Sequence, residues 1–197
     1  MSQTNKIQKI EGGSVFICAT DTLYGICTSA FDKENVERIY EIKGRDENKP
    51  FIILISDASD IKQFGVTISK KQQAFLEAIW PGKVSVILPC KLKKFEYLHR
   101  GTETLAFRMP KKVTIQDILE ATGPLVAPSA NRQGEKPAET ITEAREIFGD
   151  EIDTYISDGK LKGEPSTVVT FSGDTLVCVR VGAVPFEKIQ EVFDGVK

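Results

Sequence analysis

Histidine and cysteine are scarce in this chain, and their spacing excludes a zinc site of the common clustered kind. The 197 residues include a single histidine, His99, and four cysteines, no two of which stand in C-x-x-C spacing. Structural zinc sites need clustered ligands. We therefore expect reduced, buried thiols, a cytoplasmic protein and no bound metal, and we assign His99 to a surface loop without a role.

Long apolar runs and a large excess of charge are also missing. No stretch approaches the roughly 20 apolar residues that cross a bilayer, and segment 1–11 lacks the apolar core of a signal peptide. The net charge of −2 gives no support for wholesale nucleic-acid binding, so a basic site would need a local arrangement. We expect one domain over residues 1–197, with its core at about 10–185, and no membrane contact.

What the chain does have is a series of short apolar runs interleaved with segments of helical spacing. One helix is predicted between Asp32, which can cap it, and Gly44, which can end it. This order predicts an α/β fold (α+β in some schemes), with helices flanking a twisted, open, mixed β-sheet and a hairpin at Gly173-Asp174. Further helices are expected at about 69–79, 115–119, 141–148 and 186–193, and strands at about 14–18, 51–55, 84–88, 104–107, 125–127, 155–156, 167–171 and 175–179.

Hydroxyl, amide and cationic residues follow several of the predicted strands. In open sheets, ligands commonly bind where strand ends converge. Guanidinium and ammonium groups pair with phosphates or carboxylates, so an anionic ligand is expected there. The segments concerned are the polar turn 20–25, the stretch 43–49, Arg108, 129–131, 166–167 and Arg180.

Three cations lie close together at the end of the first predicted helix, namely Lys43, Arg45 and Lys49. They repel one another unless a bound anion or acidic neighbours offset them. Asp46 and Glu47 can do so, in which case the segment is a solvated turn, and an anion site is the alternative. The sequence has neither G-x-x-x-x-G-K-[ST] nor G-x-G-x-x-G, so a bound nucleotide would depend on side chains.

Seven short segments stand in a recognisable order along the chain. They are Thr20–Ile26 (T-D-T-L-Y-G-I), Lys43–Arg45 (K-G-R) with Lys49-Pro50, Trp80–Gly82 (W-P-G), Phe107–Pro110 (F-R-M-P), Pro128–Asn131 (P-S-A-N), Ser166–Val169 (S-T-V-V) and Arg180–Ala183 (R-V-G-A). Together they resemble the motif series of the YrdC/TsaC family of threonylcarbamoyl-AMP synthases. The resemblance covers about residues 10–185 and implies a free-standing YrdC-like domain, without the extra C-terminal domain of longer members.

The resemblance implies a specific reaction. Such an enzyme condenses L-threonine, bicarbonate and ATP to threonylcarbamoyl-AMP and pyrophosphate, and Mg²⁺ accompanies the nucleotide. A threonylcarbamoyl transferase complex then uses the product to modify adenosine 37 of tRNAs that read ANN codons. The resemblance also leaves room for a direct contact with tRNA or double-stranded RNA.

The matched segments also imply roles for individual residues. Lys43 and Arg45 are expected to be catalytic. Arg108 is expected to bind the threonine carboxylate as a fork, with Thr22 and Ser166 on the amino acid's other polar groups. No residue is assigned to a metal. The residues expected to bind ATP are Arg45, Lys49, Thr104, Ser129, Asn131 and Arg180.

Three positions depart from the family pattern. Ala19 stands in place of proline, Leu54 in place of a histidine found near the threonine in many members, and Thr170 in place of aspartate.

Two other functions remain open. One alternative is a YrdC-like RNA-binding or assembly paralogue without synthase activity. The other is a carbamoyl-adenylating domain of a different pathway. The intact segments favour the synthase, because an RNA-binding protein needs no threonine pocket.

Overall fold

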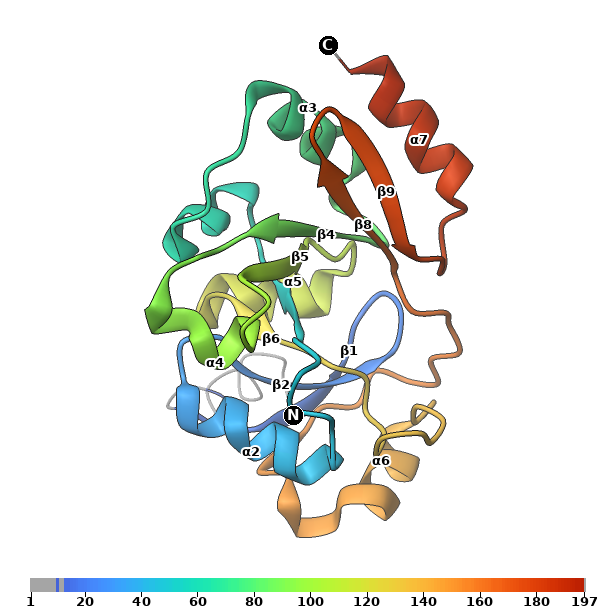
Figure 1. Ribbon diagram of the computed structural model, residues 1–197. Coiled ribbons are helices and arrows are strands. Elements are labelled where there is room, and N and C mark those ends of the chain that lie inside the picture. The colour runs from blue at the N-terminus through green and yellow to red at the C-terminus, as the bar shows by residue number, and fades with distance from the viewer. Residues whose placement is uncertain (1–9, 11–12, 197) are drawn as a thin grey trace.

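The computed structural model describes residue 10 and residues 13–196, in which nine strands form one sheet (Figure 1). The strands are β1 (Phe16–Ala19), β2 (Tyr24–Ser29), β3 (Ile52–Leu54), β4 (Val84–Pro89), β5 (Thr104–Arg108), β6 (Leu125–Val126), β7 (Thr154–Tyr155), β8 (Thr167–Ser172) and β9 (Thr175–Arg180). Their order is β7-β1-β2-β6-β3-β5-β4-β8-β9. The pairs β1·β7, β3·β5 and β4·β8 are parallel and the others antiparallel, which confirms the predicted mixed sheet and its final hairpin.

Helices flank this sheet, as predicted. In Figure 1, α2 and α6 lie at the end of the molecule that holds β1 and β2, whereas α3 and α7 lie at the opposite end, beside β8 and β9. No helix in the described part of the chain is long and apolar enough to cross a bilayer. The helices are α2 (Lys33–Lys43), α3 (Lys70–Ile79), α4 (Glu96–His99), α5 (Val113–Thr122), α6 (Ile141–Phe148) and α7 (Phe186–Gly195), with 3-10 helices η1 (Ala58–Phe64), η2 (Lys93–Phe95) and η3 (Gly149–Glu151).

The alternation of side chains along β1 divides the core into two clusters. Phe16 and Cys18 are fully buried in a cluster with Ile115 and Leu119 of α5. Ile17 belongs to the larger cluster, which also takes in residues of α2, α3 and α6. The strand is therefore apolar on both faces, which is why the sequence shows a continuous apolar run there.

Helix α2 confirms the predicted one and fixes the start of the candidate site. The carboxylate of Asp32 accepts a hydrogen bond from the N–H of Asn35 at 3.0 Å. Gly44 ends the helix in the left-handed conformation, with φ at 57°, which glycine adopts without the strain that a Cβ brings. The last helical residue, Lys43, consequently turns into the interior and is only 2% exposed.

Two local predictions were wrong. Strand β2 was not predicted, because it is buried on both faces and so shows no alternation, and Gly25, Thr28 and Ser29 also interrupt its apolar run. His99 does not lie in a surface loop. It ends α4, it is buried, and its Nδ1 accepts a hydrogen bond from the N–H of Gly101 at 3.2 Å.

Candidate active site

A cavity of about 350 Å³ lies where β4, β5 and β8 meet the loops that follow β1 and β6. Its cationic lining residues are Arg45, Arg108 and Arg180, and no aspartate or glutamate of the described chain lines it. Converging cations and hydroxyl groups suit an anionic ligand. The lining residues with hydroxyl groups are Thr20, Thr22, Tyr24, Thr102, Thr104, Ser129 and Ser166.

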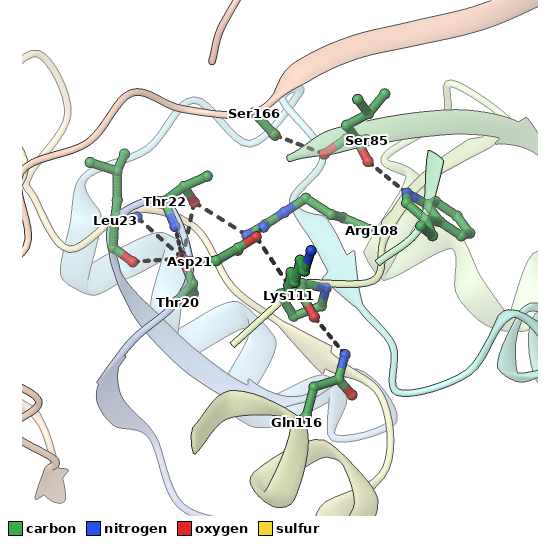
Figure 2. Close-up of polar contacts among 12 residues, drawn as sticks. Thr20, Asp21, Thr22, Leu23, Ser85, Arg108, Lys111, Gln116 and Ser166 are labelled. Atoms are coloured by element: carbon green, nitrogen blue, oxygen red, sulfur yellow. Dashed lines mark hydrogen bonds and ion pairs between the residues drawn. The ribbon is translucent and has the colours of Figure 1, made fainter. Parts of the chain in front are cut away.

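Arg108, the last residue of β5, is held by the loop that follows β1 (Figure 2). Its Nη1 forms an ion pair with Oδ1 of Asp21, and its Nη2 donates to Oγ1 of Thr22 at 3.3 Å. The other carboxylate oxygen of Asp21 accepts a hydrogen bond from the N–H of Lys111 at 3.1 Å. The ion pair is inside the protein, since the side chains of Arg108 and Asp21 are 5% and 7% exposed.

Arg45 and Arg180 have no ion-pair partner in the described part of the chain. Burial lowers the pKa of both guanidinium groups, and the charges of Arg45 and Arg108 lower the pKa of Arg180 further. The guanidinium carbon of Arg45 lies 5.3 Å from the ring centre of Phe51. An anion bound between these arginines would relieve their mutual repulsion.

Ser166 is oriented by neighbours on two strands. Its Oγ lies 2.8 Å from Oγ of Ser85 on β4, and both side chains are buried (Figure 2). A Cβ on Gly182 would lie 2.2 Å from the carbonyl oxygen of Pro165 and 2.6 Å from the carbonyl carbon of Ser166. The glycine therefore permits the close approach that lets Nη2 of Arg180 donate to the Ser166 carbonyl at 2.8 Å.

Lys43 contacts the backbone of the loop after β6 and does not line the cavity. Its Nζ donates to the carbonyl oxygens of Ser129 and Asn131, each at 2.5 Å. Burial, and then the charge of Arg45, lower the pKa of Lys43 to about 7. In this arrangement the amine shapes the loop that carries Ser129.

The side chain of Asn131 is likewise engaged within that loop. Its Oδ1 accepts a hydrogen bond from Oγ of Ser129 at 2.5 Å. Its Nδ2 donates to the carbonyls of Arg132 and Glu135, at 2.7 and 3.0 Å. These contacts fix the direction of the Ser129 hydroxyl at the cavity wall.

Lys49 lies at the surface, with its side chain 62% exposed and its Nζ 3.5 Å from a carboxylate oxygen of Asp46. This is the ion pair that a solvated turn would have. The structure leaves Lys43, Lys49 and Asn131 outside the cavity lining. The predicted residues that it brings together around the cavity are Thr22, Arg45, Thr104, Arg108, Ser129, Ser166 and Arg180.

Comparison with known proteins adds an independent finding. The Sua5/YciO/YrdC family, described as telomere recombination, matches residues 8–182. This chain belongs to that family. The match takes in all the cavity residues named above, from Thr22 to Arg180.

Three relatives in the Sua5/YciO/YrdC family show how the chain compares in length. The threonylcarbamoyl-AMP synthase of Bacillus subtilis is 34% identical over 178 residues, which is 88% of this chain and 51% of that protein. The threonylcarbamoyl-AMP synthase of Nitrosococcus oceani is 32% identical over 151 residues, 76% of this chain and 81% of that protein. The crystal structure of Pyrococcus abyssi Sua5 complexed with L-threonine is 27% identical, with a TM-score of 0.86, and the match covers 99% of this chain and 57% of that one. The chain thus spans about half the length of the first and third relatives.

The three departures from the expected Sua5/YciO/YrdC pattern lie beside the cavity, and none of them lines it. Ala19 pairs with Tyr24 in the β1·β2 ladder. Leu54 is fully buried in the smaller core cluster and stands opposite Arg108 in the β3·β5 register. Oγ1 of Thr170 donates to the carbonyl of Ile87 at 3.3 Å.

The residues present do not form a protein site for Mg²⁺. Magnesium prefers carboxylate oxygens and water. No carboxylate of the described residues lines the cavity, and no group of three potential histidine, cysteine, aspartate or glutamate ligands occurs among them. We therefore derive no step from a metal held by side chains.

Sequence reasoning missed two residues that orient this site, Asp21 and Ser85. Asp21 lies inside one of the family segments, but nothing in the sequence indicates which cation its carboxylate pairs with. Ser85 is a lone hydroxyl in the apolar run of residues 84–88. A polar residue in a buried strand needs a partner, and here it is Ser166.

Proposed function

We propose that this chain is a threonylcarbamoyl-AMP synthase, which joins L-threonine, bicarbonate and ATP and releases pyrophosphate. The observation that carries the proposal is the cavity in which Arg45, Arg108 and Arg180 converge without a lining carboxylate. The reaction brings an anionic carbamate to an anionic triphosphate, a step that depends mainly on positioning and charge neutralisation. Relatives that carry the name of this synthase support the proposal.

The chemistry divides into two balanced steps. The amino nitrogen of threonine attacks the carbon of bicarbonate, and loss of water leaves a carbamate. A carbamate oxygen then bonds to the α-phosphorus of ATP while the bond from that phosphorus to the bridging β-oxygen breaks. Pyrophosphate carries away the electron pair, so no side chain has to act as a nucleophile.

We assign the ATP side of the cavity to Arg45 and Arg180, whose charges have no ion-pair partner in the described chain. Thr104 and Ser129 are assigned to nucleotide oxygens, because their side chains line the same cavity. Asn131 joins the ATP set indirectly, through the hydrogen bond that it accepts from Ser129, whereas the exposed Lys49 is at most a peripheral member of the set. Mg²⁺ enters as part of the substrate MgATP, bound by phosphate oxygens.

Lys43 supports the ATP side through the loop backbone and not by direct contact. Its amine fixes the carbonyls of Ser129 and Asn131. This assignment replaces direct catalysis by Lys43 with positioning of the Ser129 hydroxyl. Arg45, which faces the cavity, remains the catalytic candidate of the K-G-R segment.

We assign the threonine side to Arg108, Thr22 and Ser166. Two of the five N–H donors of Arg108 are engaged, one by Asp21 and one by Thr22, so others remain for a carboxylate. Thr22 and Ser166 line the same cavity, and we assign their hydroxyls to the amino and hydroxyl groups of the amino acid. The P. abyssi relative has been solved with L-threonine, which is consistent with this assignment.

We further propose that the product passes to a threonylcarbamoyl transferase complex acting on tRNA in the cytoplasm. Threonylcarbamoyl-AMP is a mixed anhydride, and a handover that excludes water would limit its hydrolysis. A direct contact with tRNA or double-stranded RNA would use a basic surface. The exposed Lys91, Lys93 and Lys94 around η2 are the candidates.

The test is a pyrophosphate-release assay with ATP, MgCl₂, bicarbonate and threonine. Release should require threonine, and mass spectrometry should detect threonylcarbamoyl-AMP. Arg45→Ala should abolish most of the release, whereas Lys49→Ala, a matched change at an exposed cation, should have a much smaller effect. Pyrophosphate release that is the same without threonine would exclude this function and favour the RNA-binding paralogue or a different adenylating activity.

A further inference from the structure

The three arginines of the cavity differ in their counterions. Arg108 has Asp21 as a buried partner, whereas Arg45 and Arg180 have no carboxylate at ion-pair distance in the described chain. A buried ion pair has no net charge, and an unpaired guanidinium keeps a full one. The side of Arg45 and Arg180 therefore attracts polyanions more strongly than the side of Arg108.

Asp21 also fixes the direction of Arg108. One carboxylate oxygen of Asp21 pairs with Nη1 of Arg108, and the other accepts the N–H of Lys111 at 3.1 Å. Nη2 of Arg108 is at 3.3 Å from the hydroxyl of Thr22. Figure 2 shows the guanidinium reaching the loop between Asp21 and Thr22. The guanidinium cannot turn its whole fork to a phosphate without breaking the buried ion pair.

We propose that Asp21 is a specificity-determining residue, which makes the threonine end of the cavity a neutral site that accepts one carboxylate and rejects polyphosphate. This inference rests on the proposed function. Asp21 does not line the cavity, so it acts through Arg108 and does not touch the substrate. The two anionic substrates then bind at separate ends of the cavity. This matters because a triphosphate bound at Arg108 would block threonine.

Inorganic tripolyphosphate is the probe for this division. In the wild-type enzyme it should compete with ATP and not with threonine. In Asp21→Asn it should compete with threonine as well, since Arg108 is then an unpaired cation. The KM for threonine should rise about tenfold through lost positioning, while the KM for ATP changes less than about twofold.

Two further variants separate charge from structure. Adding Arg108→Gln to Asp21→Asn should remove the new competition by tripolyphosphate while the KM for threonine stays high. Asp21→Glu keeps the charge, so it should prevent that competition even if it shifts the guanidinium. Asp153→Asn is the matched control, because it breaks a half-exposed ion pair with Arg38 outside the cavity, and it should change neither KM.

The outcomes are distinguishable. Wild-type enzyme without threonine-dependent pyrophosphate release would defeat the proposed function itself. An active wild type combined with a folded Asp21→Asn that shows equal changes in both KM values, or no competition between tripolyphosphate and threonine, would overturn only the inference. If Asp21→Asn does not fold, the wild type still decides, because competition between tripolyphosphate and threonine there contradicts a neutral threonine site.

Discussion

The two loops that border the cavity are held in different ways. Within 20–23, Oγ1 of Thr20 donates to the carbonyl of Leu23 at 2.8 Å and accepts from the N–H groups of Thr22 and Leu23 at 3.1 and 3.2 Å. Within 128–131, the carbonyls are held by Lys43, which is 86 and 88 residues away in sequence. The backbone of the first loop is closed by its own neutral hydroxyl, with the Asp21–Arg108 ion pair linking it to β5, whereas the carbonyls of the second loop are held by a distant buried amine.

This difference has consequences for stability and for ligand binding. Neutral local hydrogen bonds do not titrate, so the turn that the Thr20 hydroxyl closes should keep its shape over a wide pH range, apart from the charged contact of Asp21 with Arg108. The loop 128–131 is instead linked to the end of α2 by the buried amine of Lys43, so its shape depends on the protonation of that amine. We therefore expect the ATP side of the cavity to be more sensitive than the threonine side to pH and to substitutions outside the cavity.

Lys43→Met should have the largest effect on this comparison. It leaves two buried carbonyls, those of Ser129 and Asn131, without their donor. The free energy of unfolding should fall by about 3 kcal/mol near pH 8. Urea unfolding measures this loss, and the KM for ATP should rise more than the KM for threonine.

The matched control for that change is Lys49→Met, at an exposed side chain six residues on in the same segment. It should alter the free energy of unfolding by less than about 0.5 kcal/mol. Equal losses in Lys43→Met and Lys49→Met would contradict the role of the buried amine. A larger change in the KM for threonine than for ATP would contradict its place on the ATP side.

Gly163→Ala should come next and tests how far the shape of the loop 20–23 also depends on the close approach of the backbone at Gly163. A Cβ on Gly163 would lie 2.2 Å from the carbonyl oxygen of Thr22, and backbone cannot rotate away as a side chain can. We expect a loss of about 2 kcal/mol in the free energy of unfolding and a raised KM for threonine. Gly195→Ala, where a Cβ meets nothing within 4 Å, is the control. An unchanged KM for threonine in Gly163→Ala would show that the loop 20–23 can shift to make room for the Cβ without weakening threonine binding.

Thr20→Val should have a smaller effect. It keeps the shape of the side chain but removes the oxygen that joins the ends of the loop. The expected loss is about 1.5 kcal/mol in the free energy of unfolding, measured by thermal or urea unfolding. Thr20→Ser, which restores the hydroxyl, should recover most of it. If Thr20→Val is as stable as the wild type, the hydroxyl of Thr20 contributes nothing measurable to holding the loop.

The fold could be predicted from the sequence where local signals agree. The cap at Asp32 and the left-handed Gly44 gave both ends of α2, and the turn at 173–174 gave the final hairpin. Strand β2 could not be predicted, because Gly25, Thr28 and Ser29 interrupt the apolar run by which the other doubly buried strands are identified. The order of the strands depends on contacts between distant segments, for which composition and spacing give no signal.

The candidate site was likewise predictable where the sequence carries a local signal and unpredictable where it depends on contacts between distant residues. The seven ordered segments predicted the arginines of the site, and Arg45, Arg108 and Arg180 do converge on the cavity. The sequence could not show that Lys43 turns inward while Arg45 faces the cavity, because both lie at the same helix end and differ only in what packs around them. Nor could it show that Asp21 pairs with Arg108 across 87 residues.

The smallest expected effect is a dependence on pH that should separate the two loops directly. Lys43 has an ordinary pKa of 10.5, and burial with the charge of Arg45 lowers it to about 7 in the folded protein. Between these values the unfolded chain binds more protons, so the free energy of unfolding that this group contributes rises with pH. From about pH 7 to pH 8 the rise should be about 1 kcal/mol.

Urea unfolding of the wild type and of Lys43→Met at those two pH values measures this contribution, because other titrating groups cancel in the difference. The difference in free energy of unfolding between the two proteins should grow with pH. The corresponding difference for Thr20→Val should stay constant, because its hydroxyl does not titrate. A difference for Lys43→Met that is the same at both pH values would mean that the amine keeps its ordinary pKa. The loop 128–131 would then be held by a fully charged ammonium and would be no more sensitive to pH than the loop 20–23.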